Sequence, residues 1–340
     1  MKIALVLTVK NESRLLRYNL LYHQAVGITK AFVYFDGTTD DGKKTIQDLN
    51  FVAIQDSVSA DKYIGLDFLH KFTSQAEEHH TARQCLNTYD AVQKCKDFGY
   101  DWLISIDADE LIATESDVPS DLKSFFSDVD ETIEMINFKT MEVLQQKENF
   151  GNVFSEADLF KTRKNFKYRG ESIYREIYNP KLKINEKHHF WYGQTMGKAA
   201  IKVNSNLIPI NVHRYQHIDG SKPKLINDGF VLHYHAYDAK DFIKKFKNFS
   251  NHPNHFLSGS RVEPLKLLLK DVVNNYGYSD EELKDYFNKY LLFDPKRVKQ
   301  LLRNRKLKVL KRKQNSLKRI SSAVLVFKKL NLESPHEKNQ

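Results

Sequence analysis

Three acidic residues directly follow an apolar run, and their spacing suits a divalent cation. The run WLISI (102–106) is apolar apart from one serine, and Asp107, Asp109 and Glu110 come next. In an extended backbone Asp107 and Asp109 point to the same side, so both side chains can reach one ion. Mg²⁺ and Mn²⁺ bind carboxylates and take phosphate oxygens at their remaining positions. The pattern predicts a metal site for a diphosphate leaving group, in which Asp109 is catalytic and Glu110 either shares that role or orients the pair; a solvated acidic turn is the alternative.

Two other apolar runs end in polar residues that would face the same crevice. Val9, Lys10, Asn11 and Glu12 close the first run, and Asp36 closes the second. Asn and Glu at such a strand end can bind a nucleobase and ribose. A compatible interpretation is that Asn11 caps the helix that follows. Three polar strand ends in one crevice indicate a nucleotide site more strongly than any one of them.

These residues need a sheet that brings the strand ends together. Apolar, β-rich runs at 3–9, 31–36 and 51–56 alternate with helical patterns at 15–27 and 43–50. This alternation predicts an α/β fold, a doubly wound, mostly parallel sheet flanked by helices. Ligands of such sheets bind at the carboxyl ends of the strands, where the acidic residues lie.

The remaining pattern is α/β at first and then helical. A long helix and three further strands are expected at 74–98, 133–145, 198–203 and 229–234. From about residue 238 onward the pattern is helical, and it ends in a strongly basic helix at 295–313.

Positive charge is concentrated near the C-terminus. The 340 residues carry a formal net charge of +10, but residues 296–329 hold fourteen Lys and Arg and no Asp or Glu, so the remainder carries −4. Interspersed leucines and valines make 296–313 a partly amphipathic basic helix, which can lie on an anionic membrane surface. A helix packed on the protein with a solvated charged face is the alternative. No aromatic residue lies between 296 and 326, which argues against stacking on nucleic acid.

Cysteine usage and the N-terminus bear on location. Cys85 and Cys95 show no paired spacing, which argues against a disulfide framework or a zinc site and suits a reducing compartment. The short apolar run at 3–9 is followed at once by Lys10, so it resembles a buried strand more than a signal peptide. No run is long enough to span a membrane. We expect a cytoplasmic protein, peripheral at the inner face of the membrane if the basic segment binds there.

Several short motifs follow one another in a specific order over residues 1–250. They are Lys10-Asn11-Glu12, Tyr22-His23, Val26-Gly27, Val33-Tyr34-Phe35-Asp36, Asp107-Ala108-Asp109-Glu110, Asn149-Phe150-Gly151, Gly197-Lys198, His213-Arg214 and His233-Tyr234. This order resembles the GT-A glycosyltransferases, and within them the family-2-like and family-92-like branch. The chain departs from that branch at Thr38-Thr39-Asp40, which replaces a serine-containing turn, and at 152–197, which matches loosely. The departures leave the acceptor open.

The resemblance implies a GT-A domain at 1–250, with a nucleotide-sugar half at about 1–112 and an acceptor half at about 113–250, followed by a helical basic segment at 251–340. It also implies Mn²⁺ or Mg²⁺ as cofactor and roles for individual residues. The residues concerned are, for the nucleoside, Val9, Lys10, Asn11, Glu12 and Asp36; for the metal and sugar diphosphate, Asp107, Asp109 and His233; and for phosphate, Lys198 and Arg14.

Spacing alone does not separate the remaining candidates. His233 and His235 lie on one face of their strand, so each is either a metal ligand or a core histidine, and His213 is a rival. Other histidines are expected at the surface: His79, His80, His188 and His189. An inverting transfer needs a carboxylate base, for which the candidates are Asp158, Glu171 and Glu176.

Three functions compete at this point. The leading one is an inverting, metal-dependent hexosyltransferase that moves a sugar from a nucleotide-sugar, expected to be a UDP-sugar, to a glycan or lipid-linked acceptor in cell-surface polysaccharide synthesis. A nucleotidyltransferase would use the same acids and metal, but the segment LTVKNESRLL lacks the glycines of a phosphate loop. A nucleic-acid binder acting through the basic tail is the third.

Overall fold

The sheet begins as a parallel block that brings the polar strand ends together. The computed structural model describes residues 1–161, 196–302 and 317–332. The first strands are β1 (Ile3–Val9), β2 (Lys30–Phe35), β3 (Val52–Asp56) and β4 (Trp102–Ile106). They lie in the order β3-β2-β1-β4 and every pair is parallel. Because parallel strands end at the same edge, the residues that follow β1, β2 and β4 meet there, as predicted.

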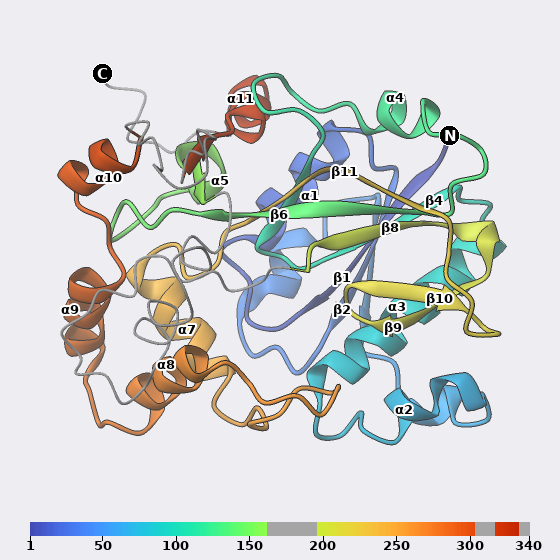
Figure 1. The fold of residues 1–340 in the computed structure, drawn as a ribbon, viewed down its shortest axis with the longest axis horizontal. Helices are drawn as coiled ribbons and strands as arrows, with labels where there is room; N and C mark the ends of the chain where they lie inside the picture. Colours follow the sequence, from blue (N-terminus) through green and yellow to red (C-terminus); the bar gives the residue numbers. More distant parts are fainter. Residues whose placement is uncertain (162–195, 303–316, 333–340) are drawn as a thin grey trace, which may run out of the picture.

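The second part of the sheet is mixed (Figure 1). Its strands are β5 (Glu110–Ala113), β6 (Met135–Val143), β7 (Leu159–Lys161), β8 (Lys198–Lys202), β11 (Leu225–His233) and β12 (Leu317–Arg319). β8 lies antiparallel between β4 and β6, whereas β11 pairs with β6 in parallel and with β5 antiparallel. A separate ribbon pairs β9 (Leu207–Asn211) with β10 (Arg214–His217). The predicted α/β fold class is confirmed, although β5, β7, β9, β10 and β12 were not predicted.

Both faces of the sheet are covered, and β1 shows why. Its residues alternate between the faces: Leu5 and Leu7 belong to one apolar cluster, and Ala4 and Val6 to another. The first cluster includes residues of α1 (Leu16–Ala25), α4 (Leu122–Ser127), α5 (Val153–Glu156) and α11 (Ser322–Lys329). The second includes residues of α3 (His80–Asp97) and of the β9-β10 ribbon.

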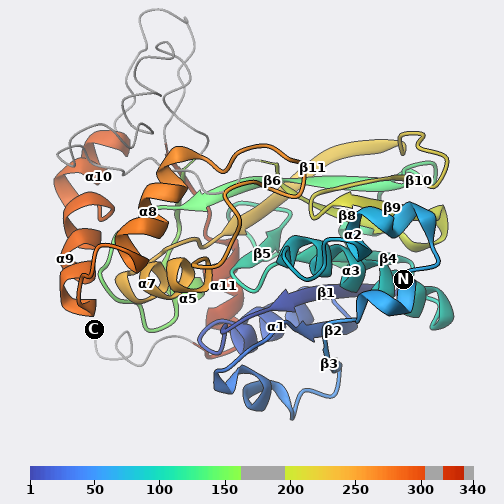
Figure 2. The same cartoon turned by 90° about the horizontal axis from the view of Figure 1, so that it is seen from below.

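Helices of the C-terminal part gather at one end of the sheet (Figure 2). They are α7 (Ala239–Asn248), α8 (Pro264–Asn274), α9 (Asp280–Tyr290) and α10 (Pro295–Leu302). The chain then returns to the sheet, where β12 pairs with β7 and Phe327 of α11 stacks on Tyr22 and Phe154. Part of the basic segment is therefore packed in the core. Among the described residues, none of the helices has the length and apolar character that crossing a bilayer requires.

Two predicted helices differ from the structure. The helix expected at 74–98 begins at His80, because Arg83 turns back and donates to the carbonyls of Ala76 and Glu77. The helix expected at 43–50 is a short 3₁₀ helix, η1 (Asp41–Ile46), which Asp40 caps. The remaining short helices are η2 (Ala60–Tyr63), η3 (Asp67–Leu69), α2 (His70–Thr73) and η4 (Val203–Ser205). Residues 303–313 of the expected basic helix lie outside the described residues.

Candidate active site

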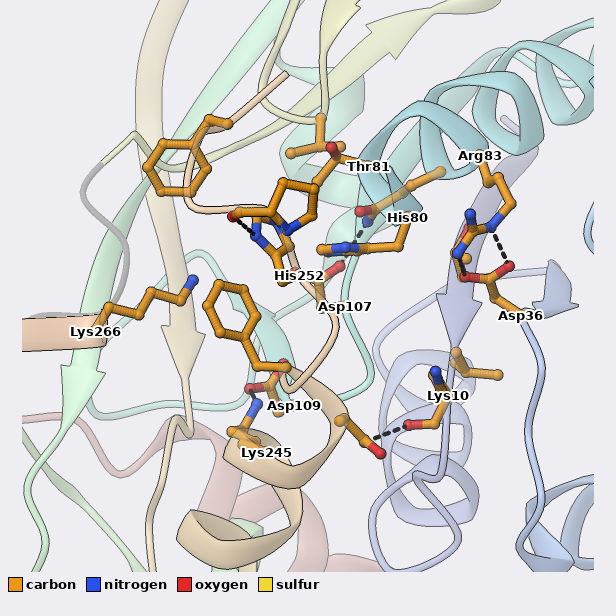
Figure 3. A pocket seen from close by; sticks show the side chains of 18 of the residues that line it. Lys10, Asp36, His80, Thr81, Arg83, Asp107, Asp109, Lys245, His252 and Lys266 are labelled. Carbon is orange, nitrogen blue, oxygen red and sulfur yellow. Dashed lines mark hydrogen bonds and ion pairs between the residues drawn. The ribbon is translucent and has the colours of Figure 1, made fainter. Parts of the chain in front are cut away.

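A cavity of about 980 Å³ opens where the parallel strands end, and two walls of different character enclose it. The strand-end wall consists of Lys10, Glu12, Asp36, Asp107 and Asp109. The helical wall comes from α7, the loop after it and α8, and consists of Lys245, Phe249, His252, Phe256 and Lys266. Figure 3 shows Asp36 and Lys10 at one side, Lys266 at the other, and Asp107 and Asp109 between them.

The acidic turn after β4 is held from below by α1. The Asp107 N–H donates to Glu110 Oε2 at 2.8 Å, and Asn19 Nδ2 donates to the Ala108 and Glu110 carbonyls at 3.0 and 2.7 Å. Glu110 is fully buried and is not among the residues that line the cavity. Burial raises the pKa of Glu110 to about 7. Of the two roles considered for Glu110, catalysis and orientation of the Asp107–Asp109 pair, these contacts favour orientation.

Asp107 lines the cavity, and two side chains donate hydrogen bonds to its carboxylate. Gln84 Nε2 donates to Asp107 Oδ1 at 2.7 Å, and Lys198 Nζ donates to Oδ2 at 2.8 Å. Lys198 is fully buried and also lies 3.4 Å from Glu110 Oε2. It therefore neutralises the two acids from beneath the turn, and the predicted contact of Lys198 with a phosphate has no support in this position.

Asp109 meets two histidines at the end of β11. Candidate ligand atoms of Asp109, His233 and His235 lie within 4.8 Å of one another. Sheet register explains this, because His233 pairs with Glu110 in the β5–β11 ladder and with Glu142 in the β6–β11 ladder. His233 Nδ1 lies 2.9 Å from Glu142 Oε2, and Nε2 lies 3.3 Å from Asp109 Oδ2. A carboxylate that orients an imidazole in this way is typical of metal-binding histidines.

The donor set fits a divalent cation. One carboxylate oxygen and two imidazole nitrogens suit Mn²⁺ better than Mg²⁺, which prefers oxygen ligands. The cluster joins two of the three predicted metal ligands and adds His235, whereas Asp107 lies outside it. Lys245 Nζ donates to Asp109 Oδ2 at 2.5 Å. Burial acts to raise the pKa of Asp109, but the charges of Lys245 and His233 hold that pKa well below its ordinary value, so the carboxylate is ionised.

Two ion pairs lie at the Asp36 side of the cavity. Arg83 binds Asp36 through Nε and Nη2 at 2.6 and 2.9 Å. Lys244 Nζ lies 2.6 Å from Glu12 Oε2. Both acids were predicted from their strand ends. Arg83 and Lys244 were missed, because a single cation on a helix looks like part of a solvated face.

Asn11 and Arg14 bond away from the cavity. Asn11, at φ 56°, accepts from the Thr39 N–H at 2.8 Å and does not cap α1, which has Leu15 at its N-cap position. The interpretation of Asn11 as a helix cap was therefore wrong. Arg14 binds Asp238 at 2.8 and 3.2 Å and thereby fixes the start of α7 against the loop after β1. Neither residue is among those that line the cavity.

The other predicted candidates are scattered. His213 lines the cavity, and its Nδ1 lies 2.8 Å from the Gly197 carbonyl oxygen. His80 lines the cavity too, whereas His79 is buried behind it, so His79 is not at the surface as expected. Asp158 forms an ion pair with Arg319 of β12 and is not among the lining residues. Candidates that lie outside the described residues are Glu171, Glu176, His188 and His189.

Fold and site together define a class of protein. Parallel strands that end at one crevice, with an Asp-x-Asp turn facing histidines from a later strand, agree with the predicted resemblance to the GT-A glycosyltransferases. Residues 9–262 match glycosyltransferase family 92, and the chain belongs to this family. The predicted resemblance is confirmed, and the family favours an enzyme over a nucleic-acid binder.

Two curated relatives and two solved structures show similarity to the chain. The Arabidopsis thaliana protein "Glycosyltransferase-like At2g41451" is 23% identical over 227 residues, 63% of this chain and 49% of that protein. "Glycosyltransferase-like At3g57200", also from Arabidopsis thaliana, is 28% identical over 153 residues, 45% of this chain and 29% of that protein. The chain thus spans about half the length of the first relative, and a smaller share of the second.

Among solved structures, S. aureus TarS 1–349 is 10% identical with a TM-score of 0.33, over 85% of this chain and 70% of that one. Glucosyl-3-phosphoglycerate synthase from Mycobacterium tuberculosis, in complex with Mn²⁺, UDP and phosphoglyceric acid, is 13% identical with a TM-score of 0.25, over 60% and 56%. At these TM-scores the likenesses carry no argument about the chemistry of this chain.

Proposed function

We propose that this protein transfers a sugar from a nucleotide-sugar, with Mn²⁺ bound by Asp109, His233 and His235. The observation that carries the proposal is the convergence of these three side chains at the edge where β1, β2 and β4 end. Their candidate ligand atoms lie close enough together for one divalent cation to join them beside the crevice. Family membership supports glycosyl transfer as the reaction.

Each group of the cavity then has a role. When bound, the divalent ion would neutralise the charge that develops on the diphosphate leaving group. Lys245 is placed to move from Asp109 to a diphosphate oxygen, because it already lies beside the metal cluster. Val9, Lys10, Glu12 and Asp36 line the opposite side and would bind the nucleoside, which we take to be uridine.

The acceptor enters from the remaining side. An inverting hexosyl transfer needs a carboxylate that removes the proton of the acceptor hydroxyl. Lining carboxylates in the described part of the chain, apart from those assigned above, are Glu77, Glu78 and Glu263. We propose a glycan or lipid-linked acceptor of cell-surface polysaccharide synthesis.

Titration calorimetry of UDP and GDP into the full chain, with Mn²⁺ and with EDTA, tests this function. We expect UDP to bind in the presence of Mn²⁺, and the Asp109→Asn variant to lose this binding. Asp97→Asn, an exposed residue at the end of α3, is the matched control and should bind like the wild type. Equal binding with EDTA, or none to either nucleotide, would contradict the proposal.

We further propose that basic residues near the C-terminus bind an anionic membrane surface. In α10 the side chains of Lys296 and Lys299 are exposed, whereas α11 buries Val326 and Phe327 in the core. Charge reversal is therefore a cleaner test than truncation. Lys296→Glu with Lys299→Glu should lower co-sedimentation with anionic liposomes, while Lys43→Glu with Lys44→Glu should not. Equal binding of both variants would remove this idea.

A further inference from the structure

Lys266 differs from the other cations of the cavity. It belongs to α8, and its Nζ lies 4.5 Å from the centroid of the Phe249 ring and 5.7 Å from that of Phe256. Ring faces attract a cation at such distances. His252 stacks on Phe249 with centroids 4.2 Å apart. This part of the helical wall is therefore an aromatic surface that presents the Lys266 ammonium group.

Within the described residues, Lys266 has no ion-pair partner, although the carboxylate of Glu263 lines the same cavity. Arg83 pairs with Asp36 and Lys245 with Asp109, but in residues 1–161, 196–302 and 317–332 no carboxylate forms an ion pair with Lys266. Burial lowers the pKa of Lys266 to about 8; the charge of Glu263 opposes this lowering, and the charge of Lys245 adds to it. Lys10 also has no ion pair there, but it is exposed and solvated. A partly buried ammonium group that forms no ion pair within the protein can accept an anion from the ligand.

The position of Lys266 in the cavity indicates which part of the substrates carries this anion. In Figure 3, Lys266 and the Asp36–Arg83 pair lie on opposite sides of the cavity, with Asp107 and Asp109 between them. If the nucleoside occupies the Asp36 side and the diphosphate lies at Asp109, the sugar and the acceptor lie toward Lys266. The diphosphate already has Lys245 as its cation, which leaves Lys266 for the acceptor.

We propose that Lys266, Phe249 and Phe256 bind an acceptor sugar or polyol that carries an anionic group, a phosphate or a carboxylate. The rings offer apolar faces to the C–H groups of the acceptor, and Lys266 Nζ donates charge-assisted hydrogen bonds to its anion. This inference rests on the proposed function, because it assumes that the nucleotide fills the other side. It narrows the substrate class from any glycan to an anionic one.

The test uses the full chain saturated with UDP and Mn²⁺. Glycerol 1-phosphate, glucuronate, glycerol and glucose are titrated separately and followed by ligand-observed NMR. We expect the wild type to bind one of the anionic probes at least tenfold more tightly than its neutral counterpart. Lys266→Met should lose this preference and keep its UDP affinity within twofold. Lys266→Arg should retain the preference, which excludes a folding defect as the cause.

Lys247→Met is the matched control, because Lys247 has the same charge but pairs with Asp280 outside the cavity. It should leave both affinities unchanged. A wild type that binds UDP but shows no preference for either anion overturns this inference alone. So does a Lys266→Met variant that loses UDP affinity and keeps the preference, since Lys266 would then serve the diphosphate. A wild type that does not bind UDP overturns the proposed function as well.

Discussion

The two walls of the cavity differ in charge and in how they are built. The strand-end wall presents Glu12, Asp36 and Asp109 from the ends of buried strands, whereas the helical wall presents Lys245 and Lys266 from helices. Ion pairs join the walls directly, from Lys245 to Asp109 and, beside the cavity, from Lys244 to Glu12. Under the proposed function, a cation would replace Lys245 as the partner of Asp109. An anionic nucleotide would replace Asp109 as the partner of Lys245, so the two ligands can enter together.

The largest expected effect on UDP affinity comes from removing a proposed metal ligand beside Asp109. His233→Ala should weaken Mn²⁺-dependent UDP binding by about 100-fold or more, on the order of 3 kcal/mol, because the ion loses one ligand and Asp109 loses a partner. Calorimetry measures the change. His217→Ala is the control, since His217 pairs with Glu134 away from the cavity. Equal affinities of the two variants would show that the cluster does not bind the ion.

The next effect is on the free energy of unfolding and comes from close packing at Gly197, next to Lys198. Gly197 has φ +75° and precedes Lys198, and an added Cβ would lie 2.2 Å from the Phe138 carbonyl oxygen. Gly99 has φ +66°, and nothing lies within 4 Å of its added Cβ. Gly197→Ala should lower the free energy of unfolding by about 3 kcal/mol or more, and Gly99→Ala by about 1 kcal/mol. Urea unfolding measures both, and a similar loss for both would contradict close packing at Gly197.

The pair between the walls predicts a pH effect of intermediate size. Burial raises the pKa of Glu12 to about 7, from the ordinary value of 4.5 that applies to the unfolded chain. The folded state therefore holds a proton that the unfolded state releases, so stability falls as pH rises from 4.5 to 7. Relative to Glu12→Gln, the wild type should lose about 2 kcal/mol of unfolding free energy between pH 4.5 and 7.5. Urea unfolding at both values checks this, and a constant difference would contradict it.

The smallest effect should have opposite signs for two ligands. Lys245→Met removes a charge that competes with a cation for Asp109 but attracts a diphosphate. We expect affinity for Mn²⁺ alone to rise about tenfold and affinity for UDP with Mn²⁺ to fall about tenfold, each about 1.4 kcal/mol. Lys247→Met, whose residue pairs with Asp280 and does not line the cavity, is the control. A parallel change for both ligands would show that Lys245 plays no part in exchanging them.

The strand-end wall was predictable from the sequence because its signal is local. Apolar runs such as 3–9 and 102–106 identify buried strands, and an acid directly after such a run needs an explanation that the fold does not supply. The parallel order then places Asp36 and Asp109 at one edge. His233 was recovered through the resemblance, and the register of β11 against β5 explains its place.

The helical wall was not predictable in the same way. Lys245 and Lys266 look like solvated charges of amphipathic helices. The partner of Lys245, Asp109, lies 136 residues away along the chain, and Lys266 contacts two rings that follow α7. Asn19 was missed because the carbonyl groups that it bonds, those of Ala108 and Glu110, lie 89 and 91 residues away along the chain. The return of β12 and α11 to the sheet also leaves no local signal, because α11 follows a basic stretch that resembles a solvated tail.

Anomalous diffraction from crystals grown with Mn²⁺ and UDP tests the central claim most directly. Data collected near the manganese absorption edge should show one strong peak among Asp109, His233 and His235, with diphosphate oxygens completing the ligands and uracil on the Asp36 side. Lys245 should then bond the diphosphate instead of Asp109. A peak elsewhere, or UDP bound in the cavity with no metal at these residues, would contradict the account.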